Sequence, residues 1–406
     1  MLKEQTYKAS NGVSIIYKEK KNKFDFKHLI FVFSGFLNST PGNYDFGNAL
    51  NDCPANVIWI NDNFEGMYSY YLCVNMLFSV EDAVTEFIYH KVNELGLTFD
   101  NITVTGFSKG GSAALYYGLK LPVANIVATV PQTKIGSYVV KHWKHVAEHM
   151  MGKITPTRVS HLDKLITQKL KQDKKLDRNI YLLTSESDIQ FPTEIVTILN
   201  DLRKYSNFNL LKTFSCFARE HNQIKSHHTA LLLGIYYSLA SEATPRFNNG
   251  EVNFFGIQPL PPKEITGEPF IDLRKAEIKD NLLFVDGVAI LRGYDLVEYS
   301  DVEYQLIFKS ERNNIVKNLA KTHKPQLTRE LFDGENLVIY DKGWFTTYQY
   351  KGIDISDIPP GKYSVYININ LSDKSACLPL TTKLNKIMTN NKCTLHVVNN
   401  IVYFEK

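Results

Sequence analysis

The sequence of 406 residues has few cysteines and no closely spaced pair of them. A disulfide framework needs an even number of cysteines in a short secreted chain, and a zinc knuckle needs C-x-x-C pairs. The five cysteines here are an odd and widely spaced set, so the pattern excludes both kinds of site. We expect reduced thiols that are mostly buried, at Cys53, Cys73, Cys216, Cys377 and Cys393.

Long apolar runs and an excess of one charge are also absent. No stretch reaches the roughly 20 apolar residues of a membrane span, and the polar residues after Met1 do not resemble a signal peptide. The 46 lysines and arginines nearly balance the 42 acids, which gives a net charge of +4. Because the basic residues are scattered, the sequence disfavours a nucleic-acid partner. We expect a cytoplasmic protein without a transmembrane segment, which could lie at the inner face of the membrane.

The first 240 residues contain a regular alternation of short β-branched runs and amphipathic segments. This alternation predicts an α/β domain over residues 1–242, with a mostly parallel sheet flanked by helices on both faces. In such sheets, functional residues gather in the loops that follow the strands. We expect strands at Val13–Tyr17, His28–Phe33, Asn56–Ile60, Ile102–Thr105, Asn125–Val130, Asn179–Thr184 and Leu210–Phe217. We expect helices at Val80–Leu95, Lys109–Leu119, Ile135–Met150, Val159–Lys171, Glu194–Tyr205 and Ile224–Leu239.

Beyond residue 242 the composition changes and helical periodicity stops. Residues 243–270 are rich in proline, asparagine and glycine, which is typical of a linker. Residues 271–406 contain apolar runs separated by polar turns, which predict an all-β sandwich domain. Four aromatic residues there could form a carbohydrate-binding platform or pack within the sandwich: Trp344, Phe345, Tyr348 and Tyr350. We expect strands at Leu282–Ile290, Val302–Phe308, Asn336–Tyr340, Tyr363–Ile369, Cys393–Val398 and Ile401–Phe404.

The most informative stretch surrounds Ser108, where a β-branched run turns through G-x-S-x-G into a helix-forming segment. At the tip of such a turn a serine hydroxyl is exposed at the end of the sheet, and Gly106 and Gly110 allow close backbone packing. The amide of Lys109 then lies at a helix N-terminus, where it can bind an oxyanion. The Lys109 side chain could meet a CoA phosphate or face solvent. Alternatively, Ser108 occupies a tight turn without chemistry.

Two further loops follow predicted strands. After Phe33, the turn that includes Gly35 and Phe36 is placed to supply a second oxyanion donor from the amide of either residue, although it could be an ordinary strand end. After Ile60, an aromatic loop includes Tyr70 and Tyr71. Its rings could stack on a sugar and bind its hydroxyls, or simply pack the loop.

An acid and a base follow later strands, in the chain order serine, acid, histidine. Asp188 is the candidate acid, and Glu186 remains an alternative because the two are only two positions apart. His221 lies nearest the end of the next strand and is the candidate base. His227 and His228 are expected to be helix residues that line the pocket or its rim.

Three other histidines share a predicted helix at a spacing that could bring their rings together. His142, His145 and His149 fall at i, i+3 and i+7. No carboxylate accompanies them except Glu148, which faces another way. We therefore expect a solvated basic helix and no metal site.

With these residues in place, residues 25–240 resemble the α/β-hydrolase-type O-acetyltransferases of bacterial capsule polysaccharide synthesis. More distantly, they resemble the hydrolase-like glycan O-acetyltransferase of the accessory Sec export system. Glu220 departs from the pattern, because a glycine is expected there. The matching segments are Thr105–Gly111 with the small-residue helix after it, Val130–Val139, Gly66–Tyr71, Thr184–Asp188 and Glu220–Asn222.

The resemblance implies an α/β-hydrolase-like domain in which Ser108 is the nucleophile, His221 the base and Asp188 the acid. It implies acetyl-CoA as the acetyl donor, with no bound cofactor, and a polysaccharide acceptor, with the capsule biosynthesis machinery as a further partner. We assign Gln132, in the second matching segment, to substrate binding together with Tyr70 and Tyr71. A carbohydrate or lipid esterase with the same triad, and a non-catalytic glycan-assembly factor, are the alternatives.

Overall fold

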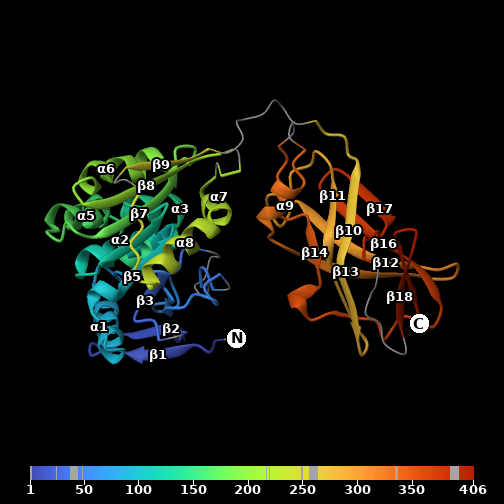
Figure 1. The fold of residues 1–406 in the computed structure, drawn as a ribbon, viewed down its shortest axis with the longest axis horizontal. Helices are drawn as coiled ribbons and strands as arrows, with labels where there is room; N and C mark the ends of the chain where they lie inside the picture. Colours follow the sequence, from blue (N-terminus) through green and yellow to red (C-terminus); the bar gives the residue numbers. More distant parts are fainter. Residues whose placement is uncertain are drawn as a thin grey trace. The chain divides into compact units, whose positions relative to one another are not determined.

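The computed structural model divides the chain into two compact units, residues 1–257 and 258–406 (Figure 1). Cys216, residues 37–38 of the predicted oxyanion loop after Phe33, and Pro259, Pro261 and Pro262 of the predicted linker lie outside the described residues. The structure describes residues 2–23, 25–36, 44–47, 49–215, 217–218, 220–247, 250–255, 264–333, 337–384 and 393–406.

The first unit is built on a nine-stranded sheet with the order β1-β2-β4-β3-β5-β6-β7-β8-β9. Strands β3 to β9 are parallel, whereas β2 is antiparallel to both of its neighbours. The central strands are continuous apolar and β-branched runs, as expected where both faces of a parallel sheet are buried. The strands are β1 (Gln5–Lys8), β2 (Ser14–Lys20), β3 (Leu29–Phe33), β4 (Asn56–Ile60), β5 (Ile102–Phe107), β6 (Asn125–Thr129), β7 (Asn179–Ser185), β8 (Asn207–Phe214) and β9 (Glu251–Phe255).

Helices cover both faces of this sheet (Figure 1). Alternate residues of β3 point to opposite faces: Phe31 and Phe33 join one core with α1, α2 and α5, whereas Ile30 and Val32 join another with α8. The predicted α/β domain with helices on both faces is thus confirmed. The helices are α1 (Ser79–Glu94), α2 (Lys109–Lys120), α3 (Ile135–His142), α4 (Lys144–Met151), α5 (Pro156–Gln172), α6 (Val196–Leu202), α7 (His221–His227) and α8 (Thr229–Ala240).

Several details of this unit differ from the sequence prediction. Strand β1 is not among the predicted strands, and the helix predicted over 224–239 is divided at His228, whose φ of −114° and ψ of 13° are not helical. The helix predicted over 135–150 is interrupted at Trp143, whose backbone angles, φ −139° and ψ 61°, are not helical. The indole of Trp143 stacks on Phe36 at 4.4 Å between ring centroids, a tertiary contact that helical periodicity does not reveal. Strand β9 lies inside the predicted linker and pairs with β8. The linker prediction for residues 243–270 is therefore wrong for residues 251–255.

The second unit is an antiparallel β domain, as predicted. Strand β13 pairs with β12 over its first part and with β14 over its last residues, so the two groups of strands are continuous. The strand predicted at 336–340 is absent over the described residues 337–340. Phe345 is buried, whereas Tyr348 and Tyr350 are exposed, so they do not form one platform. The elements are β10 (Pro269–Lys279), β11 (Leu282–Leu291), β12 (Val302–Lys309), β13 (Asn314–Thr322), α9 (Pro325–Glu330), β14 (Trp344–Thr346), β15 (Ile353–Asp354), β16 (Lys362–Leu371), β17 (Ser375–Pro379), β18 (Thr394–Val398) and β19 (Ile401–Glu405).

His28, just before β3, makes the stability of the first unit depend on pH. Its ring is buried against Thr103, and burial lowers the pKa of His28 to about 4. Between about pH 6.5 and 4 the unfolded chain binds a proton that the folded chain does not, so the free energy of unfolding falls as the pH is lowered, by about 3 kcal/mol in all. Denaturant titrations at several pH values should show a smaller decrease for His28→Gln than for the wild type. The same substitution at the half-exposed His90 should leave the decrease unchanged; an unaltered pH dependence in His28→Gln would contradict the assignment.

Candidate active site

Ser108 occupies a sharp turn between β5 and α2. Its φ of 56° and ψ of −121° place a non-glycine residue in a left-handed conformation. A Cβ on Gly106 would lie 2.2 Å from the Gly110 carbonyl, and one on Gly110 would lie 2.0 Å from the carbonyl oxygen of Phe33. The strands and helix therefore pack backbone against backbone, which only glycine permits. This is the geometry of a nucleophile elbow.

Asp188 and His221 form a hydrogen-bonded pair in the loops that follow β7 and β8. The Oδ2 atom of the buried Asp188 carboxylate is 2.8 Å from Nδ1 of His221, the first residue of α7. The imidazole lies against Phe107, the residue before Ser108, at 5.1 Å between centroids. Among the described atoms, Nε2 of His221 is buried and has no hydrogen-bond partner. When Nδ1 donates to Asp188, Nε2 is free to accept a proton.

The neighbouring candidates have other partners. Glu186 is exposed and pairs with Lys212, whose Nζ lies 2.7 Å from its carboxylate. His228 is buried, and its two ring nitrogens contact Thr213 Oγ1 and a backbone carbonyl, so it packs the helix and does not line a pocket. Glu220 has a φ of −96°, a conformation that needs no glycine. The geometry therefore pairs His221 with Asp188.

The Ser108 hydroxyl contacts Gln132. Nε2 of Gln132 donates to Ser108 Oγ at 2.9 Å, and the Gln132 side chain is fully buried. In the structure, Gln132, which the sequence assigned to substrate binding, contacts the candidate nucleophile. The structure gives no hydrogen bond between Ser108 and His221; such bonds often form fully only with substrate bound.

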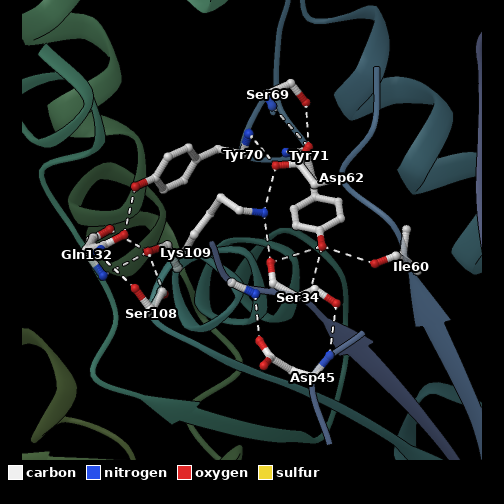
Figure 2. A network of polar contacts seen from close by, with 12 residues as sticks. Ser34, Asp45, Ile60, Asp62, Ser69, Tyr70, Tyr71, Ser108, Lys109 and Gln132 are labelled. Atoms are coloured by element: carbon white, nitrogen blue, oxygen red, sulfur yellow. Dashed lines mark hydrogen bonds and ion pairs between the residues drawn. The ribbon is translucent and has the colours of Figure 1, made fainter. Parts of the chain in front are cut away.

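The Lys109 side chain is buried and neither faces solvent nor is placed to meet a CoA phosphate. Its Nζ donates to Asp62 Oδ2 at 2.8 Å and to the Ser34 carbonyl at 2.7 Å (Figure 2). The aromatic rings of Tyr68 and Tyr71 lie within 5.0 Å of the ammonium. Burial lowers the pKa of Lys109, and the Asp62 carboxylate opposes that shift. The Lys109 backbone amide begins α2, where a helix offers no internal acceptor.

Of the two amides predicted as the second oxyanion donor, those of Gly35 and Phe36, one already has an acceptor within the protein. The Gly35 amide donates to Asp45 Oδ2 at 2.7 Å, and Asp45 Oδ1 accepts a hydrogen bond from Lys225 of α7. Because the Gly35 amide already has an acceptor, its assignment as an oxyanion donor is corrected, and Phe36 is retained. Asp45 thereby connects the loop after β3 to the helix that begins with His221.

The aromatic loop is an internal support and not a sugar platform. Tyr70 and Tyr71 have φ values of 56° and 60°, and their amides, with that of Ser69, converge on the Asp62 carboxylate at 3.0 to 3.1 Å (Figure 2). The Tyr70 hydroxyl donates to Gln132 Oε1 at 2.7 Å. The Tyr71 hydroxyl donates to the backbone carbonyls of Ser34, just after β3, and of Ile60 in β4. Both side chains are buried, so the prediction that they bind substrate is wrong.

Asp62, the acceptor of the buried Lys109 ammonium, is not among the site residues predicted from the sequence. One signal was available. A lysine that begins a helix directly after a sheet strand is placed to be buried, and a buried ammonium needs a carboxylate. Asp62 lies two residues after β4, near that end of the sheet.

The described residues contain no cluster of three or more histidine, cysteine, aspartate or glutamate side chains suited to a metal ion. The interruption at Trp143 places His142 at the end of α3, whereas His145 and His149 both lie on α4. Nor does any helix within the described ranges combine the length and apolar character needed to cross a membrane.

The first unit has the α/β-hydrolase fold. Its sheet has an antiparallel second strand, and Ser108, Asp188 and His221 follow β5, β7 and β8 in the order characteristic of these proteins.

Comparisons with known proteins agree on the fold. No protein-family model and no curated protein matches the sequence. Similar solved structures include the Gap123 glycosylation-associated complex of Streptococcus agalactiae, with 16% identity over 60% of this chain and a TM-score of 0.51. The match spans 47% of that chain.

Two other similar structures have lower TM-scores. The capsule O-acetyltransferase of Neisseria meningitidis serogroup A has 18% identity over 55% of this chain and 94% of that one, with a TM-score of 0.47. The Staphylococcus aureus serine hydrolase FphF has 13% identity over 59% of this chain and 98% of that one, with a TM-score of 0.44.

Removal of one partner of the buried Lys109–Asp62 pair should strongly destabilise the first unit. Asp62→Asn removes the charge that compensates a buried ammonium, so we expect the free energy of unfolding to fall by about 3 to 5 kcal/mol. Denaturant titration with Asp62→Asn, Lys109→Met and the double variant would measure the coupling. Asp52→Asn, which removes the exposed pair with Lys23, should cost less than about 1 kcal/mol. Equal losses in the two asparagine variants would refute the expectation.

Proposed function

We propose that this protein is a serine-dependent O-acetyltransferase. It moves acetyl from acetyl-CoA to a hydroxyl of a bacterial surface polysaccharide of the capsule type, through an acetyl-Ser108 intermediate. The observation that supports acyl transfer is the elbow conformation of Ser108 beside an Asp188–His221 pair whose Nε2 is unbonded. The choice of acetyl-CoA and of a capsule-type acceptor rests on the motif resemblance in the sequence.

In the first half-reaction, Ser108 Oγ attacks the thioester carbonyl while His221 Nε2 takes its proton. Asp188 holds the imidazole in the required tautomer and stabilises the imidazolium. The amides of Lys109 and Phe36 donate to the oxyanion. The C–S bond then breaks, the proton on His221 passes to the sulfur, and CoA leaves as the thiol.

In the second half-reaction a sugar hydroxyl replaces CoA. His221 takes the proton of that hydroxyl as its oxygen attacks the acetyl-Ser108 carbonyl, and returns a proton to Ser108 Oγ as the ester bond breaks. The products are the acetylated sugar and the free serine. If the donor were a carboxylic ester and water the acceptor, the same sequence of attack and release would make the protein an esterase. We place the reaction in the cytoplasm or at the inner face of the membrane, beside the capsule biosynthesis machinery.

The direct test is CoA release from acetyl-CoA by the full chain, with and without a panel of capsule-type polysaccharides. We expect release to rise with one polysaccharide, acetyl to appear on it, and both to be lost in Ser108→Ala. Cleavage of simple acetyl esters without glycan-dependent CoA release would favour the esterase. Inactivity in both assays, or normal glycan acetylation in cells that carry folded Ser108→Ala, would favour a non-catalytic role.

The acid can be tested separately with a matched pair of variants. Asp188→Asn removes the charge that orients and stabilises His221, so we expect kcat to fall by about a thousandfold to ten-thousandfold. Glu186→Gln alters a carboxylate two residues away that pairs with Lys212, and it should keep kcat within about twofold. A larger loss in Glu186→Gln than in Asp188→Asn would reverse the assignment of the acid.

A further inference from the structure

A buried side-chain amide lies against the candidate nucleophile. The Gln132 NH₂ group donates to Ser108 Oγ at 2.9 Å (Figure 2). The same group also lies 3.4 Å from Oε1 of Gln190. The role of this amide is separate from that of the backbone donors already described, because it contacts the attacking oxygen itself and not the position of the substrate oxyanion.

The orientation of the Gln132 amide is determined by its other contacts. The buried Tyr70 hydroxyl donates to Gln132 Oε1 at 2.7 Å, which directs the NH₂ group toward Ser108. Burial raises the pKa of the Tyr70 hydroxyl well above its ordinary value, so this group keeps its proton and remains a donor. The backbone of Gln132 is held as well. The Ser112 hydroxyl accepts a hydrogen bond from the Gln132 backbone N–H and donates one to the Gln132 backbone carbonyl.

Tyr70 is in turn held by the support beneath the elbow. Its backbone amide donates to Asp62 Oδ2 at 3.0 Å, and the same oxygen receives the Lys109 ammonium at 2.8 Å. Lys109 directly follows Ser108, so the contacts form a closed ring that runs from the elbow through Asp62, Tyr70 and Gln132 back to Ser108 (Figure 2). A closed ring of buried contacts restricts how far the Gln132 amide can move.

We propose that Gln132 is a further catalytic residue, whose amide orients the Ser108 hydroxyl and stabilises the negative charge that develops on Oγ. Tyr70 is its positioning residue. The proposal rests on the proposed function only in requiring Ser108 to be the nucleophile. Because the N–H of Gln132 occupies a lone pair of Oγ, the hydroxyl proton must point elsewhere and is available to His221. As that proton leaves, a hydrogen bond to Oγ becomes charge-assisted and stronger.

The experiment measures the rate at which a fluorophosphonate probe labels the full chain, since that reaction needs an activated serine but no acetyl donor or glycan. We expect Gln132→Ala to label about tenfold to a hundredfold more slowly than the wild type. Gln132→Glu should be slower still, because its carboxylate accepts a hydrogen bond from the serine hydroxyl, which directs the proton away from His221, and its negative charge opposes charge on Oγ. Tyr70→Phe should show an intermediate loss. Tyr205→Phe is the matched control, because it removes a hydroxyl that donates to Asp173 and contacts neither Ser108 nor Gln132. It should label at the wild-type rate.

Thermal unfolding of each variant separates a loss of structure from a loss of reactivity. Wild-type labelling that does not depend on Ser108 would overturn the nucleophile, and with it the proposed function. Labelling that depends on Ser108 but is unchanged in folded Gln132→Ala would overturn only the role of Gln132. Equal rates for Gln132→Ala and Gln132→Glu would point to simple packing and also overturn it. If neither Gln132 variant folds, an unchanged rate in folded Tyr70→Phe overturns the proposal.

Discussion

The candidate site depends on one buried ion pair, between Lys109 and Asp62. The ammonium lies directly after the elbow serine, and the carboxylate gathers three successive amides of the aromatic loop. Neither charge is accessible to water, so each needs the other, and together they connect the start of α2 to the end of β4. A left-handed serine costs conformational energy, and interactions of this kind maintain such a strained residue in the folded state.

The residue order along the chain made the fold and the main chemical groups predictable. Strand and helix periods are local properties, and a serine elbow, an acid and a histidine after successive strands can be placed by topology alone. The choice between Asp188 and Glu186 needed the structure, because two acids so close in sequence differ only in the direction their side chains take. One faces His221, and the other faces Lys212.

Features that depend on contacts between distant segments could not be predicted from the sequence. The break at Trp143 follows from its stacking on Phe36, more than a hundred residues earlier. Tyr70 and Gln132 resembled substrate contacts because aromatic and amide side chains near a sheet edge commonly bind ligands. Their burial results from the turn at Asp62 and the packing of α2, which no local pattern encodes.

Asp45 links the motion of the loop that includes Phe36 to the motion of the helix that begins with His221. Its carboxylate accepts from the Gly35 amide with one oxygen and from Lys225 with the other, and its backbone carbonyl accepts from the buried Trp59 indole. The loop that includes Phe36 and the helix that begins with His221 are therefore mechanically coupled through a residue that takes no part in bond chemistry. A shift of this helix would disturb the proton carrier and the oxyanion donor together, so both would be gained or lost as one unit.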